Sequence, residues 1–79
     1  PCASVDPLHT GDLKIGGKSR FKLKDPNSLD ECYAKCDMSP RCVGFHVQKG
    51  YCIWHSKDRE LLYDSACKTP YYDKQNNGE

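Results

Sequence analysis

The spacing of the six cysteines constrains this chain more than any other feature. Four of them form one compact run, and the other two lie toward the ends of a chain of 79 residues. The run is Cys32-x3-Cys36-x5-Cys42-x9-Cys52, and the outer pair is Cys2 and Cys67. At this length a hydrophobic core alone gives little stability, so small extracellular folds usually add covalent cross-links. An even number of cysteines in so short a chain predicts three disulfides and an oxidising compartment.

Zinc binding is the competing use of clustered cysteines. Structural zinc sites combine two closely spaced cysteines with a second Cys/His pair at similar spacing. Cys32 and Cys36 could form one half of such a site, but nine residues separate Cys42 from Cys52, which makes a poor second half. The spacing therefore favours disulfides over a metal site.

The charge balance and the hydropathy of the chain argue against several partners. Twelve basic and eleven acidic residues leave a net charge of +1, which does not favour nucleic acid or an anionic membrane as the main partner. No stretch approaches the ~20 apolar residues that cross a bilayer, so no membrane insertion is expected. Because the sequence starts at Pro1 with neither Met nor a signal peptide, we expect a part of a longer secreted protein.

A short helix is predicted in the middle of the chain. Ser28 is the expected N-cap, and Glu31 three residues later would complete a capping box. Pro40 cannot continue a helix, so the helix should end near Asp37–Ser39. The buried face follows the i, i+3, i+4, i+7 pattern and consists of Leu29, Cys32, Tyr33 and Cys36.

Two β-hairpins are predicted, one on each side of the helix in the sequence. The first spans residues 12–24, where apolar residues alternate on both sides of Gly16-Gly17. The second pairs Val43–Val47 with Tyr51–His55 across the turn Gln48–Gly50. Two neighbouring helical cysteines facing this second hairpin suit a nested disulfide pairing, although spacing alone leaves fifteen connectivities open. The nested set is Cys36–Cys42 and Cys32–Cys52, with Cys2–Cys67 as the remaining pair.

Residues 1–74 are expected to form a single domain, followed by a flexible tail or inter-domain linker at residues 75–79. Toward the end of the domain, Leu61–Tyr63 offers a short strand or turn. Tyr71-Tyr72 follows Pro70 and could add an edge strand, with one ring facing inward and the other outward.

Three short motifs resemble the PAN/apple domain superfamily. They are Cys32-Tyr33-Ala34-Lys35-Cys36, Cys42-Val43-Gly44-Phe45-His46-Val47 and Cys52-Ile53-Trp54. The resemblance is close over Leu29–Trp54, and Cys2 with Cys67 matches the end-joining bridge of the apple branch. It implies an α+β fold with one helix packed on an antiparallel sheet of about five strands, together with the nested bridges. The short, Lys- and Tyr-rich form is most similar to apple domains of apicomplexan microneme adhesins.

The same resemblance implies a secreted binding module that leaves the cell through an oxidising, microneme-type secretory organelle. Members of the superfamily bind proteins, heparin-like glycans or galactose-containing sugars, and none is an enzyme by itself. Galactose-terminated oligosaccharides or glycoproteins on host or cell surfaces are therefore the expected partners. Partner adhesins are the alternative.

Phe45 conflicts with simple strand alternation. If Cys42 faces the helix, strict alternation turns Phe45 to the opposite face, yet the superfamily buries this position. A β-bulge at Gly44, or coverage of the second face by the N-terminal loop, would reconcile the two. Trp54 shares the parity of Cys52 and is expected in the core, as is Tyr33 on the buried face of the helix.

Catalysis is not expected. All six thiols are assigned to disulfides, which leaves no cysteine nucleophile. His9, His46 and His55 lack the spacings H-x3-H and H-E-x-x-H that are typical of zinc ligands. A chain of this length is also not expected to build the deep cleft of a paired-carboxylate glycosidase. We therefore expect a binding module without a metal or cofactor.

A galactose site would combine an aromatic ring, on which the apolar face of the sugar packs, with polar groups for its hydroxyls. Two segments have this composition: His55–Asp58 at the end of the second hairpin, and Tyr71–Lys74 near the C-terminal edge. A last strand returning beside that hairpin end could bring them together. The predicted sugar-binding residues are His55, Lys57, Tyr71, Tyr72 and Lys74. The alternative for these residues is edge-strand packing for the tyrosines and solvated loops for the others.

Two other binding functions remain open. Five basic residues alternate on one face of the first predicted hairpin and could bind heparin or another polyanion, or simply form a solvated face. They are Lys14, Lys18, Arg20, Lys22 and Lys24. The apolar run Leu61, Leu62 and Tyr63 could instead contact another protein.

Overall fold

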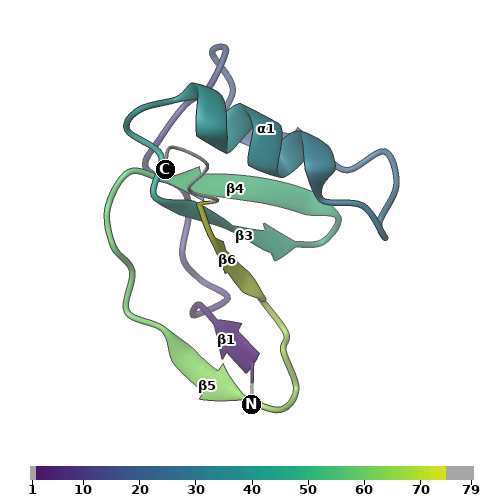
Figure 1. The fold of residues 1–79 in the computed structure, drawn as a ribbon. Coiled ribbons are helices and arrows are strands. Elements are labelled where there is room, and N and C mark those ends of the chain that lie inside the picture. Colours follow the sequence, from purple (N-terminus) through teal and green to yellow (C-terminus); the bar gives the residue numbers. More distant parts are fainter. Residues whose placement is uncertain (1, 75–79) are drawn as a thin grey trace, which may run out of the picture.

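The computed structural model describes residues 2–74, so that the predicted tail at 75–79 lies outside the described residues. Figure 1 shows a single helix lying across strands of the larger sheet, while β1 and β5 form a small sheet at the other end. In chain order the elements are β1 (Cys2–Ser4), β2 (Arg20–Lys22), α1 (Asp30–Met38), β3 (Gly44–Gln48), β4 (Tyr51–His55), β5 (Leu62–Asp64) and β6 (Tyr71–Asp73).

All strand pairs in residues 2–74 are antiparallel. The larger sheet has the order β2-β4-β3-β6, and β1 pairs with β5 in a separate two-stranded sheet. The predicted small, disulfide-rich α+β fold with one helix is therefore confirmed. The single sheet of about five strands is not, because six strands divide between two sheets.

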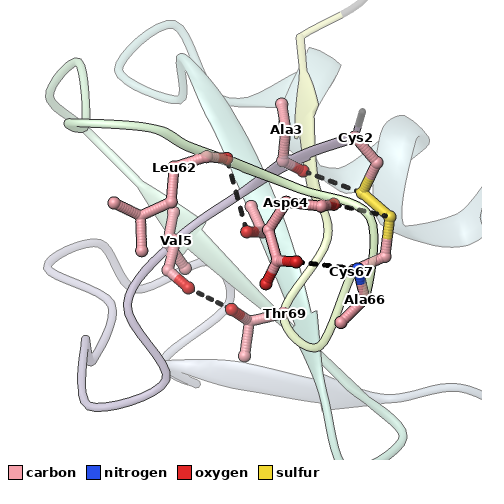
Figure 2. The surroundings of a disulfide bond; sticks show 9 residues. Cys2, Ala3, Val5, Leu62, Asp64, Ala66, Cys67 and Thr69 are labelled. Atoms are coloured by element: carbon pink, nitrogen blue, oxygen red, sulfur yellow. Dashed lines mark hydrogen bonds between the residues drawn. A yellow bond between two sulfur atoms is a disulfide. The ribbon is translucent and has the colours of Figure 1, made fainter.

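The two sheets meet beside the start of β6. The Val5 backbone N–H donates to the Thr69 carbonyl oxygen at 3.0 Å, and the Thr69 hydroxyl donates back to the Val5 carbonyl oxygen (Figure 2). Ser4 forms an isolated β-bridge with Pro70, which has no backbone N–H to continue the ladder. The proline therefore limits β1 to a brief contact with the larger sheet.

The helix begins later than its sequence predicts. Leu29 is the N-cap, without a side-chain hydrogen bond, and the predicted capping box between Ser28 and Glu31 does not form. Ser28 instead accepts a long contact of 3.5 Å from the Asp30 backbone N–H, while Glu31 lies 3.9 Å from the Lys24 ammonium group. The first intrahelical hydrogen bond runs from the Tyr33 N–H to the Leu29 carbonyl oxygen at 3.0 Å, which places the N-cap at Leu29, one residue after Ser28.

The end of the helix and its buried face agree with the prediction. The helix ends at Met38, and Ser39 is already extended before Pro40. Cys32 and Cys36 are fully buried, and Leu29 and Tyr33 pack against the core as partly buried residues.

The core lies between α1 and one face of β3 and β4. Phe45 and Trp54 are register partners and are both buried there, as predicted for Trp54. The Tyr33 ring meets Phe45 edge-on at 5.0 Å, and the Trp54 Nε1–H donates to the Cys32 carbonyl oxygen at 3.4 Å. The conflict over Phe45 disappears because β3 begins at Gly44. Cys42 thus lies before the strand and does not share its alternation.

The second hairpin is confirmed, whereas the first is wrong in its pairing. Residues 15 and 18 form only an isolated bridge across Gly16-Gly17, both of which have positive φ. β2 pairs with β4 instead, and its three residues lie opposite Tyr51–Ile53 at the edge of the larger sheet. The segment before Gly16, which was predicted to pair with β2, instead packs closely on the sheet. Leu13 is buried in the core. The backbone at Gly11 lies so close to β4 that a Cβ there would be 2.7 Å from the Trp54 carbonyl oxygen.

The three disulfides have the nested pairing that the sequence favours. Two of them join α1 to the segment just before β3 and to β4, and the third joins β1 to the connection between β5 and β6. They are Cys36–Cys42, Cys32–Cys52 and Cys2–Cys67, and all six cysteines are paired.

Replacing both outer cysteines, Cys2→Ser with Cys67→Ser, should lower the free energy of unfolding by about 4 kcal/mol. This bridge closes a loop with a sequence separation of 65, and the entropy of the unfolded chain grows when that loop is opened. Urea unfolding measures the loss, and the near-UV circular dichroism of Trp54 should stay unchanged because its core keeps both inner bridges. A loss below about 1 kcal/mol would show that this bridge contributes little.

Candidate functional site

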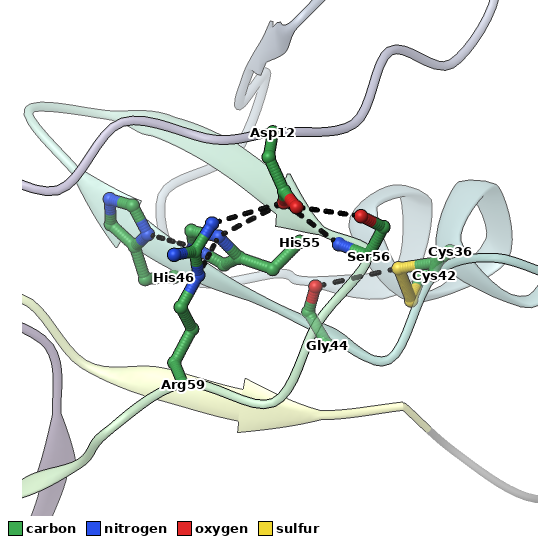
Figure 3. A network of polar contacts seen from close by, with 8 residues as sticks. All are labelled: Asp12, Cys36, Cys42, Gly44, His46, His55, Ser56 and Arg59. Carbon is green, nitrogen blue, oxygen red and sulfur yellow. Dashed lines mark hydrogen bonds and ion pairs between the residues drawn. A yellow bond between two sulfur atoms is a disulfide. The ribbon is translucent and has the colours of Figure 1, made fainter.

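The face of the larger sheet that points away from α1 buries two stacked histidines. His46 on β3 and His55 on β4 are fully buried, with ring centroids 4.9 Å apart. The His46 Nδ1 atom lies 2.7 Å from the His55 Nε2 atom. Figure 3 shows Arg59 and Asp12 approaching this pair from the connection after β4 and from the N-terminal segment.

Arg59 decides which atom donates and which accepts in the hydrogen bonds that link it to His55 and His46. Its Nε–H lies 2.8 Å from His55 Nδ1 and can only donate, so Nδ1 accepts and the proton of neutral His55 is on Nε2. His55 Nε2–H then donates to His46 Nδ1, and His46 Nε2–H donates to the Gln48 side-chain oxygen at 3.4 Å. The Gln48 amide completes the chain by donating to the Pro7 carbonyl oxygen at 2.8 Å.

Asp12 anchors the other end of this chain. Its carboxylate accepts from the Ser56 backbone N–H at 2.9 Å and the Ser56 hydroxyl at 2.6 Å, and it pairs with Arg59 Nη2 at 3.0 Å. Burial raises the pKa of Asp12, but the Ser56 hydrogen bonds and the Arg59 charge outweigh it and hold the pKa well below its ordinary value of 3.8. The carboxylate is therefore ionised at neutral pH.

Both histidines are held in the neutral form. Burial, followed by electrostatic coupling to His46 and the charge of Arg59, lowers the pKa of His55 to about 4, although the Asp12 charge acts in the opposite direction. Burial also lowers the pKa of His46 below its ordinary value of 6.5, although the hydrogen bond that His46 donates to Gln48 acts in the opposite direction. The cluster thus carries an ion pair, Arg59 with Asp12, beside two uncharged rings.

The predicted galactose-binding residues occupy different environments. His55 is fully buried, and Tyr71, nearly buried beside it, has its ring centroid 6.1 Å away. Tyr72 faces the helix side, stacked on Phe45 at 5.4 Å, so that the two tyrosines point to opposite faces as strand alternation predicts. The Lys74 ammonium group donates to the Ser39 carbonyl oxygen at 2.9 Å. Lys57 is exposed.

The strand order brings the two predicted segments close to each other, with β3 lying between them. β6 pairs with β3, so that Asp73 lies opposite Gly44, which in turn lies opposite His55. Gly44 is required there because a Cβ at this position would overlap the Tyr71 hydroxyl group. Burial raises the pKa of Tyr71 to about 12, with Asp73 and Asp58 adding to the effect. The side chains nevertheless do not share one exposed surface, and galactose binding stays a prediction.

Two adjoining depressions lie along the β2 edge, and together we call them the basic hollow. They have volumes of about 590 Å³ and 520 Å³ and share Ser19, Arg20 and Tyr51 as a common wall. The N-terminal residues 7–11 form the far side of the larger one, and the Arg20 guanidinium carbon lies 4.4 Å from the Tyr51 ring centroid. The cationic side chains that line the hollow are Lys14, Lys18, Arg20, Lys22 and Lys49.

Sequence reasoning identified four of these five cations. Lys24, the fifth basic residue of the predicted hairpin face, lies beside Glu31 and does not line the hollow. Lys49 and Tyr51 were missed because they come from the second hairpin, whose edge was not expected to pair with β2. The histidine pair had a partial signal, since His46 and His55 occupy the same face of the predicted hairpin, but nothing local identifies Arg59 and Asp12 as their partners.

Within residues 2–74, no group of three or more His, Cys, Asp or Glu side chains is arranged to hold a metal ion. In the same residues, no helix has the length and apolar character needed to cross a membrane.

No family model, no curated protein and no solved structure matches the chain. Three disulfides in a domain of this size are typical of an oxidising extracellular environment.

The free energy of unfolding should fall as the pH drops from 6.5 to 5. The folded pKa of His55 lies below its unfolded value of 6.5, so the unfolded chain binds more protons in this range. The stability is complete above pH 6.5, and this histidine alone should account for a loss of about 2 kcal/mol by pH 5. Asp12 acts in the same direction only below pH 3.8 and does not contribute in this window.

Urea unfolding at a series of pH values measures this slope. A His9→Asn variant serves as the control, because His9 is only partly buried and lies outside the stacked pair. It should retain the fall in stability. A flat profile between pH 6.5 and 5 would contradict the neutral, buried state of the pair.

Proposed function

We propose that the chain is an extracellular binding module of the PAN/apple type that recognises anionic glycans through the basic hollow. The fold class and the three disulfides support the module assignment, since the chain uses all six cysteines as cross-links. The lining of the hollow carries the ligand assignment. On this proposal the domain belongs to a secreted, multi-domain adhesin of the microneme kind and contributes to attachment at host or cell surfaces.

The distribution of charge is the observation on which the proposal rests. The chain as a whole is nearly neutral, with twelve basic and eleven acidic residues. The hollow is not: five Lys and Arg side chains line it, and no Asp or Glu does. Such one-sided clustering raises the local concentration of anions and orients them toward the hollow.

The chemistry of the lining suits a sulfated or uronate-containing sugar. A guanidinium group presents paired N–H donors that match a sulfate or carboxylate, and contact with the Tyr51 ring fixes the position of Arg20. The hydroxyl groups of Thr10 and Ser19 are available to the hydroxyls of a sugar, and Ile53 offers it an apolar wall. These are the groups that recognise a charged sugar rather than a neutral one.

Replacing Arg20 with Ala should weaken the binding of a heparin-derived oligosaccharide about tenfold or more, because hydrogen bonds between charged groups contribute about 1.5–3 kcal/mol. Lys24→Ala is the matched control. It removes the same charge from the same segment, but Lys24 is highly exposed and lies outside the hollow. Isothermal titration of both variants and the wild type gives the affinities.

If both substitutions weakened oligosaccharide binding equally, net charge alone would matter. That result would contradict a binding site formed by specific residues of the basic hollow. A parallel NMR titration with lactose tests the galactose prediction. Saturable shifts at Tyr71–Lys74 and Lys57 with lactose, and none with the oligosaccharide, would transfer the function to a neutral-sugar site.

A protein-binding role is the second candidate, and β5 favours it. Among residues 2–74 this strand pairs with β1 alone, and Leu62 and Tyr63 expose 46% and 69% of their surface. A free strand edge with exposed apolar side chains is a common docking place for another chain. A partner adhesin would be the corresponding ligand, and substitution of Tyr63 by Ser should then abolish its binding without affecting the basic hollow.

A further inference from the structure

The stacked histidines have no room for an additional proton in their present arrangement. Each ring donates through Nε2 and accepts through Nδ1, and the chain starts at a guanidinium N–H that cannot reverse its role. Protonation turns an acceptor into a donor. A proton added to either ring would therefore place two N–H donors opposite each other without an acceptor between them, and one hydrogen bond must break.

The groups around the pair decide which bond breaks. A proton on His46 Nδ1 would face the His55 Nε2–H across 2.7 Å. A proton on His55 Nδ1 would instead find the Asp12 carboxylate 3.8 Å away, once Arg59 had moved aside. The added proton therefore belongs on His55 Nδ1, and the bond that is lost is the one from Arg59 Nε–H.

Other charged or titratable groups act on the pair from each neighbouring element. His9 and Asp12 come from the N-terminal segment, Arg59 from the connection after β4, and Tyr71 from β6. Asp58 and Asp73 act on Tyr71 in turn. Asp12 is the acidic group in contact distance of His55, which agrees with its role as the acceptor after protonation.

Arg59 holds the connection between the two sheets. This connection runs from Ser56, directly after β4, to Leu61, directly before β5. Among the hydrogen bonds and ion pairs of the described residues, those made by residues 57–61 belong to Arg59, which reaches His55 and Asp12. Loss of the His55 contact removes one of the two contacts that hold residues 57–61, and protonated His55 then competes with Arg59 for the Asp12 carboxylate.

We propose that the contact between Arg59 and His55 is acid-sensitive: it holds residues 57–61 of the connection on the larger sheet at neutral pH and releases them when His55 takes up a proton. The release concerns β5 as well, because the connection leads directly into this exposed strand. The lowered pKa values of both histidines agree with a closed contact at pH 7 and with opening only under acidic conditions. This inference does not depend on the identity of the glycan.

NMR spectroscopy of the 15N-labelled domain tests the proposal between pH 7.5 and 4. Long-range 1H–15N correlation spectra of the histidine rings should show the Nε2–H tautomer for both His46 and His55 at pH 7.5. As His55 protonates, the Arg59 Nε–H signal should disappear and the heteronuclear NOE of residues 57–61 should fall with the same midpoint. The amides of β3 and β4 should keep their shifts and their rigidity through this midpoint.

Two substitutions in the same connection separate this role from a general loss of charge. Arg59→Met should lower the heteronuclear NOE of residues 57–61 already at pH 7.5 and raise the pH at which His55 protonates, since the charge of Arg59 is gone and Asp12 remains. Lys57→Met removes an exposed cation that contacts neither histidine and should behave as the wild type. An Nδ1–H tautomer for His55, an unchanged connection in the Arg59 variant, or unfolding of the whole domain at the His55 midpoint would each overturn the proposal.

Discussion

The attachment of α1 to the hairpin β3–β4 by two disulfides is the constraint on which the rest of the structure depends. The bridges Cys32–Cys52 and Cys36–Cys42 are buried under the helix and fix it over one face of the sheet. That face then receives the largest apolar side chains, Phe45 and Trp54. With so short a chain, little apolar material is left for the other face, and polar groups have to be buried there.

The histidine cluster is the consequence of this shortage. Burial of a polar group is costly unless its hydrogen bonds are made, and a buried network is favourable when every member is satisfied. Here Arg59 begins a chain of donors that passes through both rings and Gln48 and ends on a backbone carbonyl oxygen. The same chain ties the N-terminal segment and the connection after β4 to the sheet, where there is no disulfide to do so. The polar face is thereby organised by hydrogen bonds and the apolar face by covalent bonds, and only the former respond to pH.

The sequence predicted those parts of the fold that local patterns determine. The apolar stripe and Pro40 were sufficient for the helix, and Lys49-Gly50 for the turn of the second hairpin, where both residues have positive φ. The pairing of β2 was beyond such reasoning, because the alternation around Gly16-Gly17 is equally compatible with a hairpin and with pairing to the edge of β4. The same limit applies to the sites. Lys49 and Arg20 meet only because β2 pairs with β4, and Asp12 and Arg59 meet only because the N-terminal segment crosses the sheet.

The N-terminal segment connects the two sites on this side of the molecule. Pro7 accepts the last hydrogen bond of the histidine chain, and residues 7–11 then form a wall of the basic hollow before Asp12 returns to Arg59 and Ser56. The wall is thus fastened at both ends by one hydrogen-bonded network. A binding surface built on a loop gains precision when the loop is held in place before the ligand arrives, since less entropy is lost on binding. The neutral histidines therefore contribute to the shape of the hollow without lining it, and under the proposed function their burial would matter for glycan binding as the exposed cations do.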